Sequence, residues 1–99
     1  LSTKEYVAPR TETEEQLAAI WQNLLGIEKV GIHDNFFELG GHSLLVTRLV
    51  SIIRDELSIE IPITDIFKFN TVYELSSYLN YKIISFNDSI DEFSMNIEL

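Results

Sequence analysis

The sequence predicts an all-α fold, a small bundle of three main helices and one short helix with a flexible C-terminal tail. Apolar residues recur with a helical period in three separate stretches. Residues that favour helix starts stand at or before these stretches. The composition agrees, because 45% of the residues are hydrophobic and there are only four glycines and two prolines. We therefore expect a hydrophobic core built mainly from helices.

The predicted organisation is a linker over residues 1–10, a folded domain over residues 11–80 and a tail over residues 81–99. The linker contains Pro9 and shows no apolar period, which is typical of a connecting segment. The chain starts at Leu1 and not at a methionine, so we expect it to continue from a longer chain upstream.

The first helix is predicted to begin near Thr11 and to end at Gly26. Thr11 with Glu14, or Thr13 with Gln16, fits a capping box, and the early glutamates suit the positive end of the helix dipole. Apolar residues follow at helical spacing and form one stripe. This stripe, which we expect to face the core, consists of Leu17, Ile20, Trp21, Leu24 and Leu25.

A loop is predicted between Ile27 and Gly41, because the helical period breaks there and glycines punctuate the stretch. The loop still contains large apolar residues, so we expect it to be pinned to the core. We interpret Asp34 and Asn35 as an Asx turn or cap ahead of two aromatic residues that anchor the loop in the bundle, Phe36 and Phe37.

The second main helix is predicted from about His42 or Ser43 to Leu57. Its apolar residues fall within a narrow arc of the helix and include Val46, Leu49, Val50, Ile53 and Leu57. The opposite face carries Leu44 among polar residues. Leu44 is therefore an apolar side chain that the core stripe does not use.

Two further helices are predicted after a break. The stretch from Pro62 to Phe69 starts with a proline, which suits a first helical position, so a helix of one or two turns is expected. Thr71 with Glu74 fits another capping box and leads into a last helix that is predicted to end near Asn80.

The tail from Tyr81 to Leu99 differs in kind, because we find no sustained amphipathic period in it. Its formal charge is 1 − 4 = −3, against 6 − 12 = −6 for residues 1–80. At its end Met95, Ile97 and Leu99 alternate with polar residues. This alternation predicts a short β-strand that would add to the sheet edge of a partner.

Charge and composition disfavour several classes of function. The formal charge of −9 makes nucleic acid and anionic lipid poor partners. The chain has no cysteine, which excludes disulfides and thiolate nucleophiles and fits a reducing cytoplasm. Its apolar runs fall far short of the roughly 20 residues that span a bilayer. We expect a soluble, cytoplasmic monomer without a metal site.

The residues best suited to chemistry surround Ser43. Gly40 and Gly41 let the backbone turn tightly before it and keep bulk away from an incoming phosphodiester. A serine at a helix start lies beside unpaired N–H groups and the positive end of the helix dipole, where a phosphate is favoured. From its position alone, the same serine is more often a simple N-cap.

The eleven residues from Asp34 to Leu44, which read DNFFELGGHSL, resemble the cofactor-attachment motif of carrier proteins. The resemblance is to the peptidyl carrier, or thiolation, domains of nonribosomal peptide synthetases, and it covers nearly all of residues 6–80. It implies that Ser43 is esterified by 4′-phosphopantetheine from coenzyme A. The thiol of that arm would hold aminoacyl or peptidyl thioesters on a domain that performs no catalysis. Carriers of fatty-acid and polyketide synthesis usually show an acidic residue where His42 stands, so the resemblance favours a peptidyl or aryl carrier.

The resemblance also implies partners. A phosphopantetheinyl transferase would attach the arm beside Gly41 and His42, and adenylation, condensation and optionally thioesterase domains would exchange intermediates with it. Contacts with these enzymes are predicted for Leu44, and for Ile66 and Phe67 unless these two pack in the core. We interpret the tail as a docking segment for an N-terminal docking domain on the downstream subunit, with a linker to a following domain as the alternative. The predicted docking residues are Asp91, Glu92, Met95, Ile97, Glu98 and Leu99.

Two other functions compete with a carrier. One is a helical protein-interaction module whose Ser43 is never modified. The other is a small hydrolase that uses a His42–Ser43 pair. Neighbouring residues at a helix start tend to point apart, and the sequence GHSLL lacks the second glycine of a hydrolase nucleophile elbow, so the hydrolase is disfavoured.

Overall fold

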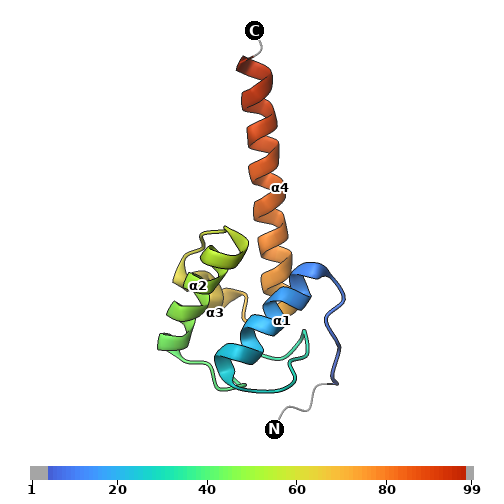
Figure 1. Cartoon of the computed structure of the whole chain (residues 1–99), viewed down its shortest axis with the longest axis vertical. Helices are drawn as coiled ribbons and strands as arrows, with labels where there is room; N and C mark the ends of the chain where they lie inside the picture. The colour runs from blue at the N-terminus through green and yellow to red at the C-terminus, as the bar shows by residue number, and fades with distance from the viewer. Residues whose placement is uncertain (1–4, 98–99) are drawn as a thin grey trace.

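The computed structural model of the chain describes residues 5–97, with side chains described for residues 5–85. Within this range it contains four helices and no named strand, which confirms the predicted all-α bundle of three main helices and a short one. The helices are α1 (Glu12–Leu25), α2 (Ser43–Leu57), α3 (Ile63–Lys68) and α4 (Val72–Ile97). Figure 1 shows α1, α2 and α3 grouped around the first turns of α4, while the rest of α4 projects from the bundle.

The start of α1 is capped as predicted, but its capping box is incomplete. The N–H of Glu14 donates to Thr11 Oγ1 at 3.1 Å. The Glu14 carboxylate does not return to Thr11 and instead accepts from the backbone N–H of Arg10 at 2.8 Å and from its guanidinium at 3.0 Å. Thr13, the alternative cap, donates to Asn80 Oδ1 at 3.0 Å and so ties α1 to α4.

The other helix ends follow ordinary capping physics. Thr71 Oγ1 accepts from the N–H of Glu74 at 3.1 Å and donates to its carboxylate at 3.2 Å, so the predicted pair caps α4. Gly26 ends α1 in the left-handed conformation at φ 67°, where glycine carries no Cβ penalty. Ser58 ends α2 with a similar φ of 57°.

The core is contributed by all four helices, by the loop between α1 and α2 and by Ile61 in the connection between α2 and α3. Its buried residues are Leu17, Ile20, Trp21, Val30, Ile32, Phe36, Val46, Leu49, Ile53, Ile61, Ile66, Val72, Leu75 and Leu79. Three of them, Val30, Ile32 and Phe36, belong to the loop, which is therefore pinned to the core as predicted.

Backbone hydrogen bonds fasten the same loop on two sides. The N–H of Ile32 donates to the carbonyl of Val7 at 2.9 Å, and its own carbonyl accepts from the N–H of Tyr73 at 2.9 Å. The N–H of Phe36 donates to the carbonyl of Asn70 at 2.8 Å. The loop thus lies between the N-terminal segment and the start of α4, and this arrangement holds the residues before α2 in place.

The end of α4 corrects the sequence analysis. The helix runs to Ile97 and does not end near Asn80. Met95–Ile97, the first residues of the predicted strand, are helical, while Glu98 and Leu99 lie outside the described residues. The short alternation of apolar and polar residues misled the prediction, because a helix also repeats apolar residues at spacings of three and four along this stretch.

Among the described residues, no helix combines the length and the apolar character that crossing a membrane requires.

Candidate functional site

The loop before α2 is stabilised by two local polar contacts. Asn35 Oδ1 accepts from the N–H of Phe37 at 2.8 Å and from that of Glu38 at 3.2 Å, which confirms the predicted Asx turn. Asp34 Oδ2 accepts from the N–H of Gly31 at 2.9 Å. These two polar side chains therefore hold the loop in shape.

Phe36 anchors the loop in the core. Its ring is fully buried and meets Trp21 edge-on, with ring centroids 5.0 Å apart. The neighbouring Phe37 is only partly buried, and its ring stacks on Phe67 of α3 with centroids 5.1 Å apart. The prediction that both rings anchor the loop in the bundle is thus right in full for Phe36, while Phe37 connects the loop to α3 near the surface.

Gly40 and Gly41, the two glycines before α2, are required for different structural reasons. Gly40 has a φ of 111°, which side-chain-bearing residues rarely adopt. A Cβ on Gly41 would lie 2.3 Å from the ring of Phe36 and 2.8 Å from its carbonyl oxygen. The missing side chain of Gly41 therefore makes room for the buried Phe36, a reason that the sequence analysis did not give.

Ser43 is the first residue of α2 and is exposed. The N-cap of α2 is His42, whose backbone is extended and whose side chain makes no capping hydrogen bond. Ser43 is therefore not the N-cap that its position alone suggested. Its carbonyl accepts from Thr47 Oγ1 at 3.2 Å, whereas we find no hydrogen bond from its hydroxyl to another described residue.

The electrostatics of this helix start favour an anion. The first N–H groups of a helix lack partners within it, and the dipole places partial positive charge there. The first turn of α1 contains Glu12, Glu14 and Glu15, but the first turn of α2 contains no acidic residue. No carboxylate of its own first turn therefore competes with a phosphate group on Ser43.

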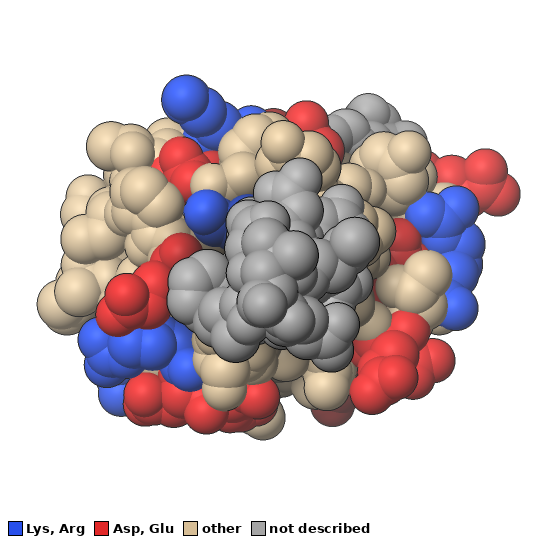
Figure 2. Space-filling model, turned by 90° about the horizontal axis from the view of Figure 1, so that it is seen from above, with Lys and Arg blue, Asp and Glu red and all other residues tan. Residues whose placement is uncertain are grey.

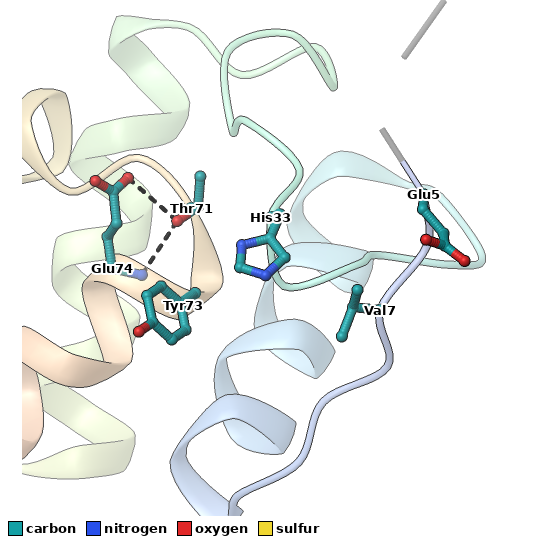
Figure 3. Close-up of a pocket in the computed structure, with 6 residues that line it drawn as sticks. All are labelled: Glu5, Val7, His33, Thr71, Tyr73 and Glu74. Carbon is teal, nitrogen blue, oxygen red and sulfur yellow. Dashed lines mark hydrogen bonds between the residues drawn. The ribbon is translucent and has the colours of Figure 1, made fainter. Parts of the chain in front are cut away.

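The geometry gives no support to catalysis by Ser43. His42 is also exposed, and no hydrogen bond joins its ring to the Ser43 hydroxyl among the described contacts. No group of three metal-ligating side chains comes together within the described part of the chain. A hollow of about 660 Å³ lies between the N-terminal segment, the loop and the start of α4, and Figure 3 shows six residues that line it, including His33 and Tyr73. Ser43 does not line this hollow.

Apolar side chains are exposed beside Ser43 and on α3. Leu44 is 66% exposed and Phe67 is 50% exposed, so both are accessible, and their contact with a partner stays a prediction. Ile66 is fully buried, so for this residue the alternative of packing in the core holds. Ile63, which the sequence analysis missed, is 44% exposed. Its spacing of four from Phe67 was the available signal, since residues four apart share a helix face.

A polar contact on the inner side of α3 holds that helix against α4. The hydroxyl of Tyr78 donates to the buried carboxylate of Asp65. This hydrogen bond, together with burial, raises the pKa of the Tyr78 hydroxyl above its ordinary value. Asp65 lies with Ile66 on the buried side of α3, whereas Phe67 lies on the exposed side.

The docking residues predicted in the tail fall outside what the structure describes in detail. The side chains of Asp91, Glu92, Met95 and Ile97 are not among the described side chains, and Glu98 and Leu99 lie beyond the described residues altogether.

Comparisons with known proteins agree with the motif. A family model described as "Phosphopantetheine attachment site" matches residues 15–79. Tyrocidine synthase 3 of Brevibacillus parabrevis is 49% identical to the chain over 81 residues, which are 82% of this chain and 1% of that protein. The chain thus spans only 1% to 2% of the length of the curated relatives it matches first.

Solved structures are similar as well. A solution structure of a non-covalent extended docking domain complex of the Pax nonribosomal peptide synthetase, of PaxA with PaxB, has a TM-score of 0.79 at 42% identity. The match covers 97% of this chain and 94% of the chain in that structure. A peptidyl carrier protein in complex with the phosphopantetheine transferase Sfp and coenzyme A has a TM-score of 0.74 at 37% identity, covering 77% and 99% of the two chains.

Proposed function

The chain belongs to the phosphopantetheine attachment site family, and from this premise we propose that the hydroxyl of Ser43 is the group that carries 4′-phosphopantetheine. The observation that carries the proposal is that Ser43 is exposed at the first position of α2 while His42 occupies the N-cap. The fold therefore makes no use of the hydroxyl. It remains accessible to a transferase that approaches from outside.

The chemistry expected of Ser43 is that of a substrate. Its Oγ would form an ester bond to the pantetheine-bearing phosphorus of coenzyme A, while the bond from that phosphorus to the bridging oxygen breaks and adenosine 3′,5′-bisphosphate leaves with that oxygen. The hydroxyl proton would pass to a base of the transferase, since the described residues place no base on the hydroxyl. The unpaired N–H groups at the start of α2 would then lie beside the new phosphodiester. When attached, the group supplies a thiol that holds acyl groups as thioesters.

Gly41 and His42 support this role in different ways. Gly41 allows the loop to lie directly on the buried Phe36, two residues before Ser43. His42 is exposed next to Ser43, and its side chain makes no capping hydrogen bond, so its ring is available to the arm or to a partner enzyme.

The proposed partners are those of a nonribosomal peptide synthetase in the cytoplasm. Adenylation and condensation domains, and optionally a thioesterase domain, would meet the exposed Leu44 and Phe67, with Ile63 added to the predicted set and Ile66 removed from it. The tail would dock to an N-terminal docking domain of the downstream subunit. The similarity to a docking-domain complex over nearly the whole chain supports this assignment.

The test of the attachment site is the mass of the chain after incubation with coenzyme A and a phosphopantetheinyl transferase of broad specificity. The wild-type chain is expected to gain one phosphopantetheinyl group, and Ser43→Ala is expected to gain none. Ser51→Ala, a serine further along the same helix, is the matched control and is expected to be modified like the wild type.

The same experiment separates the carrier from the competing functions. An unchanged mass of the wild-type chain would favour an unmodified helical interaction module. A mass increase that persists in Ser43→Ala would keep the carrier function and move the attachment to another residue.

A further inference from the structure

Residues 6–10, which precede α1, are fastened to the bundle, and we call them the strap. Near its start, the carbonyl of Val7 accepts from the N–H of Ile32 at 2.9 Å. At its end, the guanidinium of Arg10 forms an ion pair with Glu14 at 3.0 Å. Val7 is also partly buried and packs against the core. The strap is therefore packed on the folded domain, although it contains no helix or strand.

The strap lies close against the loop at Gly31. A Cβ on Gly31 would lie 3.2 Å from Cδ1 of Tyr6 and 3.4 Å from the backbone nitrogen of Val7. The ammonium nitrogen of Lys29 lies 3.9 Å from the centroid of the Tyr6 ring. The missing side chain of Gly31 thus lets the strap lie directly on the backbone of the loop.

Gly31 begins a series of hydrogen-bonded turns that leads to α2. The N–H of Asp34 donates to the carbonyl of Gly31 at 3.1 Å, and the Asp34 carboxylate accepts from the N–H of Gly31 at 2.9 Å. The Asx turn at Asn35 follows, and the N–H of Gly41 donates to the carbonyl of Phe36 at 2.9 Å. The strap therefore adjoins one end of a hydrogen-bonded segment whose other end lies at the start of α2.

Ile32 is the point at which the strap can act on this segment. Its side chain is fully buried, its N–H donates to Val7, and its carbonyl accepts from the N–H of Tyr73 at 2.9 Å. Ile32 is thus held between the strap and α4. Without the strap, the N–H of Ile32 would lose its protein partner, and a buried donor is costly to leave unsatisfied. The loop would be held less firmly at this point.

The strap can move without unfolding the bundle. The side chains of Tyr6 and Arg10 are 43% and 55% exposed, and the fully buried core begins only at Leu17. The hollow in Figure 3 separates Val7 of the strap from Tyr73 at the start of α4. Segments with few buried contacts open locally at a lower free energy than the core does.

We propose that the strap is a positioning element for the attachment reaction. While it is seated on the loop, the start of α2 keeps the form that a transferase accepts, and when it is released that form is less populated. Tyr6 and Val7 are the positioning residues, because they supply the contacts with the loop. This inference rests on the proposed function of Ser43. It adds that the unit a transferase needs begins at Tyr6 and not at Thr11.

The test compares the kinetics of phosphopantetheine transfer to variants of the full chain. Tyr6→Ala combined with Val7→Ala removes the side chains that hold the strap on the loop. When only a fraction of a protein is competent to bind, its apparent affinity falls by that fraction. We therefore expect the KM for the carrier to rise about three- to tenfold while kcat is unchanged. Tyr6→Phe keeps the ring beside Gly31 and is expected to behave like the wild type.

Two controls separate positioning from other effects. Glu5→Gln combined with Ala8→Ser changes two exposed residues of the same segment and is expected to leave KM unchanged. Gly26→Ala strains the backbone at the end of α1, where a Cβ meets nothing within 4 Å, and is also expected to leave KM unchanged. The proposal fails if Gly26→Ala raises KM as much as the double substitution in the strap, or if that double substitution leaves KM unchanged.

Amide hydrogen exchange tests the strap independently of Ser43. In the double variant the amides of Ile32 and Gly41 are expected to exchange faster, while those in the middle of α1 stay protected. Faster exchange at Ile32 without a change at Gly41 would mean that release of the strap does not reach the start of α2, and it would overturn the inference alone. A failure of the attachment site would appear as a missing mass increase and leave the exchange measurement unaffected.

Discussion

At the scale of single residues, Ser43 and Gly41 lie two positions apart and obey different constraints. The Ser43 hydroxyl is exposed and outside the capping of α2, so the fold does not depend on it. Gly41 lies directly over the buried ring of Phe36 and has no room for a Cβ. The hydroxyl of Ser43 is thus available for modification, while Gly41 is packed tightly against the core.

Replacing Gly41 by alanine tests this packing. The added Cβ would lie 2.3 Å from the ring of Phe36, which is held by Trp21 and cannot easily move. We expect Gly41→Ala to lower the free energy of unfolding by about 1–3 kcal/mol, as overpacking of a core does. Chemical denaturation followed by Trp21 fluorescence measures the loss.

Gly26→Ala is the control for that substitution. Gly26 also has a positive φ, but a Cβ there would meet nothing within 4 Å. Gly26→Ala is expected to lower the free energy of unfolding by about 1 kcal/mol, from the cost of a left-handed backbone at a residue with a Cβ alone. If Gly41→Ala proved no more destabilising than Gly26→Ala, the contact with Phe36 would not explain the glycine.

At the scale of elements, the N-terminal segment is held to α1 by one charged pair. Glu14 has a side chain that is only 4% exposed and accepts from both the backbone and the guanidinium of Arg10. The hydrogen bond from the Arg10 side chain is the main reason why the pKa of Glu14 lies below its ordinary value. The same pair raises the pKa of Arg10.

The lowered pKa of Glu14 predicts how stability depends on pH. A carboxylate with a depressed pKa in the folded state stabilises the fold above its ordinary pKa of 4.5, and this contribution disappears as the pH falls through the folded value. Glu14→Gln is therefore expected to be less stable than the wild type at neutral pH, with a difference that shrinks on acidification below 4.5. Denaturant unfolding of both chains, from neutral pH to below pH 4.5, measures this difference in stability.

Glu15→Gln is the matched control, because Glu15 lies in the same first turn but is exposed. It is expected to keep the pH dependence of the wild type. A constant difference between Glu14→Gln and the wild type at every pH would contradict the assignment of the charged pair.

At the scale of the whole molecule, the folded core and the projecting part of α4 are separate in sequence. Every buried residue of the core lies between Leu17 and Leu79. On the face that Figure 2 shows, Lys and Arg alternate with Asp and Glu around the rim and form no single basic patch. Because the core ends at Leu79, the bundle should fold without the turns of α4 that follow Ser85.

Two truncations test this separation. A chain that ends at Ser85 keeps all core residues and is expected to unfold within about 2 °C of the full chain. A chain that ends at Tyr78 loses the fully buried Leu79 and is expected to be destabilised by about 2–5 kcal/mol. Thermal unfolding followed by circular dichroism compares the three chains. A large loss in the chain that ends at Ser85 would mean that residues 86–99 contribute to the core.

The sequence by itself determined the helical bundle, the anchored loop and the attachment motif around Ser43. Helical periodicity, capping pairs and the glycine-rich loop are local patterns, and the physics behind each acts over a few neighbouring residues. Such signals locate the start of α2 within one residue and place Leu44 away from the core.

Only the tertiary structure decided which of two adjacent apolar residues faces outward on α3, what Gly41 makes room for, and how far α4 continues. Ile66 is buried and Phe67 is half exposed, and which of them faces the core depends on the elements that pack against α3, such as α2 and Tyr78 of α4. The tail contained a helical stripe that a few alternating residues concealed. Burial depends on what packs against a residue, and that neighbour is found only when the chain has folded.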